Sequence, residues 1–375
     1  MTLWGIVLFA LEAAIVFLVS TLLFDILHYL LHRWEKSRFR LLRLFSSWHW
    51  VHHKFLDRNM QINPRYVREN FWFHILPEYV TSMAGTVIFL IVFPWPPVAA
   101  IAVLRTIMLV GTIREEGMDF NHMSMDRLDG QRPLWWVNAS YHALHHVYPH
   151  NFFSSFFNLF DLFAGTGQQI EGRHYLVTGA SGAYGSAMVK RLQELGGVVE
   201  TAKSGVDFAP GDYERMREKL ERADVLILAH GAKSEDCWNA NYRTPTDLID
   251  LFTAIGRDRL TPPEVWGLGS EVELHGDLGM DELKDYAASK RAFAARAIGY
   301  YLSGAVIYRH IVPAAFTSAM GKGGMSAATA VGITLFFIKR GFTYVPVTYT
   351  TLALWNYLRF RFLQRPNAQT LHPAE

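Results

Sequence analysis

Nine histidines in the first 150 residues have the spacings of metal ligands. They form one HxxxH pair, two HxxHH groups and one isolated residue: His28, His32, His49, His52, His53, His122, His142, His145 and His146. Imidazole is a good ligand for borderline transition metals such as iron and zinc. On a helix, residues three or four apart share one face, so each group can direct two imidazoles at one metal. Nine ligands exceed the four of a tetrahedral zinc site, which indicates a dinuclear centre.

Apolar segments flank these histidines. Residues 3–24 form a run long enough to cross a bilayer as a helix. The alternative, a cleaved signal peptide, would need a basic region before the run and a small-residue cleavage site after it, and neither is present. A second run, 71–93, ends at a Pro-Trp-Pro-Pro sequence that predicts a tight turn, and a third, 98–113, is short for a span. We expect the last two runs to form a hairpin that dips into the membrane.

The charge distribution predicts the orientation of the chain. Arginines and lysines are dense between residues 33 and 68, and such residues beside apolar helices mark the cytoplasmic side. The hairpin would return the chain to that side, so we expect the histidines and the domain that follows them on the cytoplasmic face. The formal net charge of +2 argues against nucleic acid as a partner. The single cysteine, Cys237, cannot form an internal disulfide.

The histidine motifs and the residues after them resemble the membrane fatty acid hydroxylase and sterol desaturase superfamily. The resemblance rests on the three histidine groups, the Asn121-His122 pair and the segment 145–166, which is similar to the family's HH…NFGSS…WDxLFGT signature. Phe153 stands where the signature has glycine, and Ala164 lies inside its LFGT-like end. Neither change removes a ligand. The resemblance covers residues 1–168.

This resemblance implies a di-iron centre, held by the nine histidines, that uses O2 to attack an unactivated C–H bond of a membrane lipid. It also implies an external electron donor, namely a reductase with a ferredoxin or a cytochrome. We expect His74 and His150 to support the ligands rather than to bind metal.

From residue 173 onward, strand-like and helix-like runs alternate, as in an α/β domain with a parallel sheet. The first strand-like run leads into a glycine-rich turn that opens an amphipathic helix. Glycines let the backbone approach a pyrophosphate, and the helix N-terminus offers free N–H groups and a positive dipole end. The turn therefore predicts a dinucleotide site that includes Gly179, Ser181, Gly182 and Gly185.

Tyr286 and Lys290 are four residues apart, which is about one helical turn. The positive charge of Lys290 is expected to lower the pKa of Tyr286 and to make the phenol a usable acid or base near neutral pH. Ser270 ends a strand-like run upstream and could hydrogen-bond the carbonyl or hydroxyl on which Tyr286 acts. This ordered set predicts alcohol–carbonyl chemistry.

The order of glycine turn, serine and YxxxK resembles the short-chain dehydrogenase/reductase family across residues 173–350. The resemblance implies that Ser270, Tyr286 and Lys290 are catalytic and that Asn241 completes a proton relay. It also implies four further cofactor contacts: Asp207, His230, Gly231 and Thr317. His230 stands where the family has an asparagine.

Lys203 and Ser204 follow the expected second strand of this domain. An acidic residue there favours NAD, whereas basic and hydroxyl groups favour the 2′-phosphate, so we expect NADP(H) in preference to NAD(H). After residue 330, apolar runs lie beside basic residues. They predict either a substrate lid with ordinary core or an amphipathic segment on the membrane surface.

The expected architecture is an α-helical integral membrane histidine-box domain at 1–168, a linker at 169–172 and a Rossmann-type, doubly wound parallel-sheet α/β domain at 173–375. The expected function is a bifunctional oxidoreductase. It would hydroxylate or desaturate a sterol-like, carotenoid or acyl lipid and would interconvert an alcohol and a carbonyl with NAD(P). An aldehyde- or alkane-forming wax-type enzyme is the alternative, and a lipid- or redox-sensing scaffold is a further one.

Overall fold

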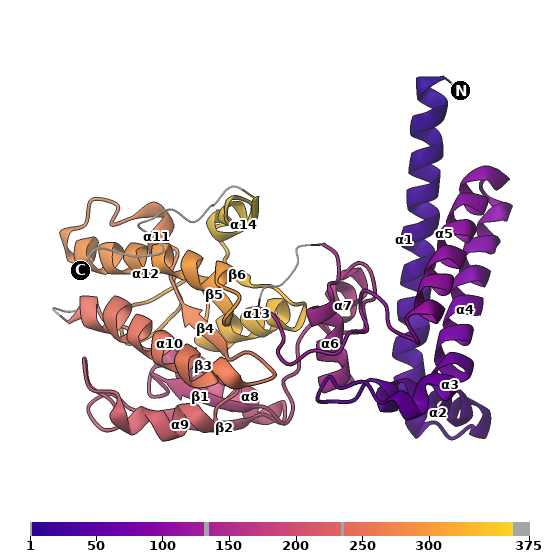
Figure 1. Cartoon of the computed structure of the whole chain (residues 1–375). Coiled ribbons are helices and arrows are strands. Elements are labelled where there is room, and N and C mark those ends of the chain that lie inside the picture. Colours follow the sequence, from indigo (N-terminus) through magenta and orange to yellow (C-terminus); the bar gives the residue numbers. More distant parts are fainter. Residues whose placement is uncertain (1, 131–134, 234–235, 363–375) are drawn as a thin grey trace. The chain divides into compact units, whose positions relative to one another are not determined.

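The computed structural model describes residues 2–130, 135–233 and 236–362 of the chain. These residues form two compact units (Figure 1). The first comprises Met1–Asp126 and Trp135–Gly167, and the second comprises Arg127–Leu134 and Gln168–Glu375. Ile170, inside the segment predicted to be a linker, is buried in the core of the second unit.

The first unit is built from helices: α1 (Leu3–Arg33), α2 (Arg40–Phe55), α3 (Val67–Asn70), α4 (Leu76–Val87), α5 (Trp95–Arg114), α6 (Ala139–Val147) and α7 (Leu159–Ala164). Helices α1, α4 and α5 pack side by side (Figure 1). With the turns that continue them, they give three segments long and apolar enough to cross a membrane, at Leu3–Lys36, Pro64–Ile91 and Trp95–Arg114. Because these segments also expose many large apolar side chains, the chain is a membrane protein.

The third apolar segment is longer than the sequence predicted. Helix α5 has 20 residues and begins at Trp95, with Pro94 as its N-cap and proline in its first turn. Proline is well tolerated there because the first N–H groups of a helix have no intrahelical partner. The prolines that predicted a turn therefore start the helix, and the prediction that this run is short for a span was wrong.

The second unit contains six strands that form one parallel sheet: β1 (His174–Thr178), β2 (Val198–Ala202), β3 (Val225–Leu228), β4 (Glu264–Leu268), β5 (Ile307–Pro313) and β6 (Tyr344–Val347). Its helices are α8 (Ala183–Glu194), α9 (Arg217–Arg222), α10 (Thr244–Ile255), α11 (Val272–His275), α12 (Lys284–Leu302), α13 (Ala327–Lys339) and α14 (Leu352–Phe362). The strand order is β2-β1-β3-β4-β5-β6. The succession of strands reverses direction between β1 and β3, which is where such sheets bind ligands at their carboxyl ends.

Helices cover both faces of the sheet. Successive residues of a strand point to opposite faces, so neighbouring residues pack against different helices. Leu176 packs with the core formed by α9, α10 and α12, while its neighbour Val177 packs with α8 and α13. The predicted doubly wound α/β fold after an apolar helical half is thereby confirmed. Between β2 and β3 the described chain has α9 and a short 3-10 helix but no strand, so the sheet has one strand fewer on the β2 side than the 3-2-1-4-5-6 order.

Candidate metal centre and dinucleotide site

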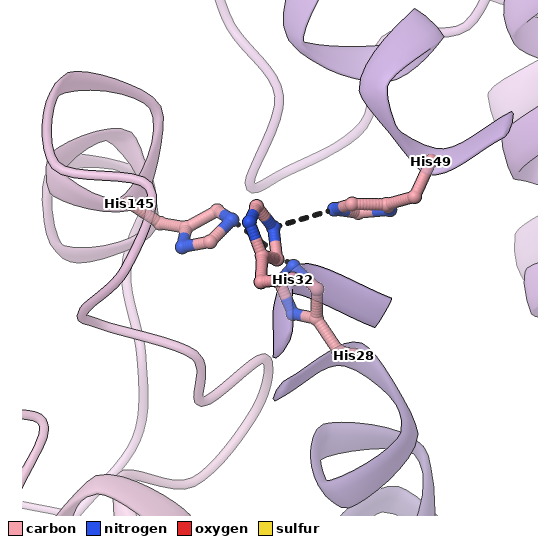
Figure 2. A group of neighbouring side chains, drawn as sticks. All are labelled: His28, His32, His49 and His145. Carbon is pink, nitrogen blue, oxygen red and sulfur yellow. Dashed lines mark hydrogen bonds between the residues drawn. The ribbon is translucent and has the colours of Figure 1, made fainter. Parts of the chain in front are cut away.

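The predicted metal ligands converge from four separate helices and loops into two buried groups. The first consists of His28, His32, His49 and His145, and the second of His52, His122, His142 and His146. Within each group the potential ligand atoms all lie within 4.8 Å of one another. Figure 2 shows the first group, with side chains from α1, α2 and α6 pointing at one another. The ninth predicted ligand, His53, belongs to neither group, but its Nε2 lies 3.3 Å from His32 Nε2.

Backbone and side-chain oxygens hold the outer ring nitrogens of these histidines. The Nδ1 atom of His145 lies 2.8 Å from the Asn151 carbonyl, and that of His146 lies 2.9 Å from the Leu56 carbonyl. A carbonyl oxygen can only accept, so Nδ1 carries the proton and Nε2 keeps its lone pair for a metal. In the second group, the buried Nε2 atoms of all four histidines have no hydrogen-bond partner. Such orphaned, converging nitrogens fit a metal ion, because a buried polar atom otherwise needs a partner.

Burial also favours the neutral, ligand form of these imidazoles. Removal from water lowers the pKa of His49, His142 and His145 well below the usual value, and neighbouring imidazoles act in the same direction. Metal ligation requires an unprotonated ring nitrogen, so the surroundings prepare these side chains for it at neutral pH.

Two residues that support the ligands, Asp119 and Asn70, were not found from the sequence, whereas His74 was expected in this role. Asp119 Oδ1 accepts from His122 Nδ1 at 2.9 Å, an arrangement that orients a metal-binding histidine. Asn70 Oδ1 lies 3.3 Å from His52 Nδ1, and the ring of His74 stacks on His52 with the centroids 3.7 Å apart. His74 sits on a π-helical turn, Phe71–Ile75, a geometry common at functional sites. The sequence contained one signal for the role of Asp119, namely its position three residues before His122.

The glycine turn after β1 has the geometry that a dinucleotide needs. Gly179 has a φ of +70°, and a Cβ there would lie 2.5 Å from the backbone nitrogen of His230. The backbone of Gly185 lies so close to Gly179 that a Cβ on residue 185 would be 2.1 Å from the carbonyl oxygen of Gly179. Gly182 is the N-cap of α8 and has no capping side chain, while Ser181 is exposed beside it. This open helix N-terminus at the β1/β3 reversal fits a pyrophosphate.

The other predicted cofactor residues lie at the ends of neighbouring strands. Lys203 and Ser204 are exposed and directly follow β2. The Asp207 carboxylate accepts from the backbone N–H of Lys203 at 2.7 Å and pairs with Lys219 at 3.1 Å. His230 and Gly231 follow β3, with His230 Nδ1 2.7 Å from Thr178 Oγ1. Thr317 is exposed in the segment after β5.

Replacing Lys203 by Asp should shift cofactor preference from NADP(H) towards NAD(H) by about tenfold, which corresponds to about 1.4 kcal/mol. The side chain would change from attracting to repelling the 2′-phosphate, whereas the bond from its backbone N–H to Asp207 would remain. The ratio of the two dissociation constants, from quenching of tryptophan fluorescence, measures the effect. Arg191→Asp on α8 is the matched control and should leave the ratio unchanged; an equal shift in both variants would contradict the assignment.

The predicted catalytic residues meet at the carboxyl ends of β3 and β4. Ser270 follows β4 and hydrogen-bonds Tyr286, which lies on α12 one turn before Lys290. The buried ammonium of Lys290 donates to the Leu268 carbonyl at 2.7 Å. Asn241, on a second π-helical turn, donates to the Ala232 carbonyl at 2.8 Å and lies beside Gly231.

The pKa of Tyr286 differs from the sequence expectation. Burial raises it, the hydrogen bond with Ser270 acts against this rise, and the nearby Glu273 carboxylate adds to it. The expectation of a lowered pKa was wrong, because burial of the phenol outweighs the effects that lower it. A protonated Tyr286 is suited to donate a proton to a carbonyl oxygen.

Reduction of a carbonyl is expected to slow as the pH rises through about 8. Burial lowers the pKa of Lys290 to about 8, so its positive charge is present below that pH and lost above it. The initial rate of nicotinamide oxidation with a ketone, measured from pH 6 to 10, would reveal this decrease as the alkaline limb of the pH–rate profile. Lys290→Arg should move the limb to higher pH, since a guanidinium stays charged; an unmoved limb would assign it to another group.

Comparison with known proteins agrees with the motifs in the first unit. Residues 14–166 match the model of the fatty acid hydroxylase family. The N-terminal part of the chain therefore carries a fatty acid hydroxylase domain, and the predicted resemblance is confirmed.

Two kinds of relative extend into the second unit. A monoglucosyldiacylglycerol epimerase of Synechocystis is 24% identical, over 86% of this chain and 88% of that protein. Among solved structures, a short-chain dehydrogenase of Burkholderia cenocepacia in complex with NADP is 17% identical, with a TM-score of 0.41 over 52% of this chain and 100% of that one. A short-chain dehydrogenase/reductase of Burkholderia phymatum in complex with NAD is 15% identical, with a TM-score of 0.40 over 56% and 99%.

A hydroxylase domain among membrane-spanning helices, followed by a Rossmann-type domain, makes the chain a lipid-modifying oxidoreductase of a membrane. Its buried histidine groups can hold metal ions.

Proposed function

We propose that the chain is a two-site lipid oxidoreductase, in which a di-iron centre oxidises a carbon of a membrane lipid and a nicotinamide site interconverts an alcohol and a carbonyl on it. The observation that carries the proposal is the pair of four-histidine groups, whose ring nitrogens converge in a buried position. The intact set of Ser270, Tyr286 and Lys290 in the second unit supports the nicotinamide step.

In the first unit, the nine histidines would hold two iron ions, which supply the activation of O2. The overall balance is that O2, two electrons and two protons convert a C–H bond to C–O–H, and the second oxygen atom leaves as water. The electrons come from a separate reductase with a ferredoxin or a cytochrome. The residues of this chain position the ligands: Asp119 orients His122, and main-chain carbonyls fix His145 and His146.

In the second unit, the glycine turn would bind NADP(H), which donates or accepts the hydride. In the reductive direction, Tyr286 donates its proton to the carbonyl oxygen as hydride reaches the carbon. Ser270 orients that oxygen through its hydroxyl, and the charge of Lys290 stabilises the phenolate that Tyr286 becomes. Both sites are proposed to face the cytoplasm, from the density of basic residues at 33–68.

The lipid mass profile of cells that make the substrate tests the proposal. Cells would express the wild-type chain, Tyr286→Phe or His145→Ala. The oxygenated lipid that has not passed through the alcohol–carbonyl step should accumulate only with Tyr286→Phe, because oxidation of the carbon continues while that step stops. Identical profiles with the wild type and Tyr286→Phe would remove the basis for two sites on one lipid.

A second candidate function is epimerisation of a glycolipid. The Synechocystis epimerase favours it, because the alignment extends through both units of this chain. The nicotinamide site has suitable chemistry: a bound oxidised cofactor would take up the hydride of the carbinol carbon and return it to the opposite face. The hydroxyl proton would pass to the phenolate form of Tyr286 and would return from it. No net oxidation occurs, so neither O2 nor an electron donor is consumed.

The two candidates differ in their need for oxygen. Purified chain with an oxidised nicotinamide and monoglucosyldiacylglycerol, incubated without O2, should change the headgroup sugar if the chain is an epimerase. The two-site proposal expects no product under those conditions and an oxygenated product when O2 and a reductase are added.

A further inference from the structure

We propose that Arg105 binds the anionic group of the lipid that enters the first unit, so the substrate is an acidic amphiphile and not a neutral lipid. The inference deepens the proposed function and rests on it. A cavity that is open to the surface lies among α1, α4 and α5. Its lining runs from His52, His122 and His142 to Arg105.

Arg105 lies midway along α5 and is only 7% exposed. Its Nε donates to Thr86 Oγ1 at 2.9 Å, and its Nη2 donates to Ser20 Oγ at 2.7 Å and Thr21 Oγ1 at 3.3 Å. Hydroxyls from two neighbouring helices therefore fix the guanidinium plane. Ser20 and Thr86 give their own protons to main-chain carbonyls, so their oxygens are oriented to accept.

These contacts give Arg105 no carboxylate in direct contact, and only the more distant Glu78 carboxylate acts on its charge. In the described part of the chain, no carboxylate lies within 4.0 Å of the guanidinium, and no acceptor is within hydrogen-bond distance of Nη1. A charged arginine at membrane depth is costly, and such residues mark substrate or ion pathways. The two N–H groups of Nη1 remain available to a ligand.

The carboxylates of the cavity are engaged elsewhere. Glu78 lies 3.3 Å from His74 Nε2, and Asp119 lies 2.9 Å from His122 Nδ1. Glu78 precedes Thr86 by eight residues, which is about 12 Å along a helix. The cavity thus has acidic groups paired with imidazoles at the histidine end and an unpaired cation at the other.

The guanidinium fork matches a carboxylate or a phosphate, which it can bind through two parallel hydrogen bonds. A neutral hydroxyl would leave the charge without an anion in direct contact. The apolar side chains of Phe24, Met108 and Leu109 line the same cavity and suit a hydrocarbon chain. A free fatty acid and an acidic phospholipid share this chemistry, since both join an oxyanion to an acyl chain.

Lipid binding to the purified full chain tests the inference. The chain, in neutral detergent, would be titrated with oleate, with phosphatidate and with a neutral glycolipid, and bound lipid counted by native mass spectrometry. The wild type should bind at least one anionic lipid at least tenfold more tightly than the glycolipid. Arg105→Gln should lose that preference, whereas Arg114→Gln, at the exposed end of the same helix, should keep it. The oleate and phosphatidate arms identify which oxyanion is bound.

A second variant guards against a folding defect in Arg105→Gln, which iron content and melting temperature would reveal. Ser82 lines the cavity one turn before Thr86, so Ser82→Asp should pair with Arg105 and weaken binding of the anionic lipid at least tenfold. Ser82→Asn is the matched neutral control and should bind as the wild type does. Equal anionic binding by the wild type, Arg105→Gln and Ser82→Asp would overturn the inference. Because the readout is binding, that failure would leave the lipid profiles of the proposed function intact.

Discussion

His145→Ala is expected to abolish oxygenation of the lipid and to lower the iron content of the purified chain. His145 is fully buried, its Nε2 lies 3.0 Å from His28 Nε2, and its Nδ1 is fixed by the Asn151 carbonyl. Loss of a residue that merely supports a ligand costs about 10–100-fold in metal affinity or activity, so loss of a ligand should cost at least about 100-fold. Iron analysis and product yield with O2 and a reductase measure both effects.

The matched control is His150→Ala, in the same segment. From the sequence, His150 was expected to support the ligands, but the residue is exposed, belongs to neither four-histidine group and has its ring centroid 6.0 Å from that of His32. It should keep the iron and the activity. Nicotinamide binding should be unaffected in both variants. Full iron content in His145→Ala would contradict the assignment, and loss of nicotinamide binding as well would contradict two separable sites.

Tyr286→Phe is expected to reduce alcohol–carbonyl conversion by about 10²–10⁴-fold, the usual contribution of a positioned proton donor. The substitution removes the phenolic proton and the hydrogen bond with Ser270 and keeps the ring. Iron content and nicotinamide affinity should match those of the wild type, because the phenol supports neither. The rate of nicotinamide oxidation with a ketone measures the loss of conversion, and fluorescence quenching measures the nicotinamide affinity.

Tyr301→Phe, later on the same helix, provides the comparison for this variant. The ring of Tyr301 packs against Phe360 with the centroids 4.9 Å apart, far along α12 from Tyr286. Loss of the Tyr301 hydroxyl should leave the rate of nicotinamide oxidation within a few-fold of that of the wild type. If Tyr286→Phe behaved in the same way, the proton would have to come from another group.

The sequence predicted much of the architecture because the relevant patterns are local. Histidines three or four apart on a helix, a glycine turn after an apolar strand and a YxxxK pair each lie within a few residues. The second strand also ended where expected, directly before Lys203. The family match at residues 14–166 confirms what the histidine motifs predicted for that part.

What the sequence missed depends on contacts between distant segments. Asn70 reaches His52 across 18 residues, and Ser20 reaches Arg105 across 85, so neither pairing has a local signature. The pKa of Tyr286 was predicted with the wrong sign because the burial that raises it comes from the packing of segments that are distant in the sequence. The length of α5 was misjudged because proline in a first helical turn reads as a loop.

An incubation under ¹⁸O2 tests the central claim, that two sites of one chain act on one lipid. Purified wild type and Tyr286→Phe, each with a lipid extract, a reductase system and NADP(H), would be compared by the masses of their products. The account predicts a product with one ¹⁸O atom from each protein, the two products differing by two hydrogen atoms. Products of equal mass, or products without ¹⁸O, would contradict it.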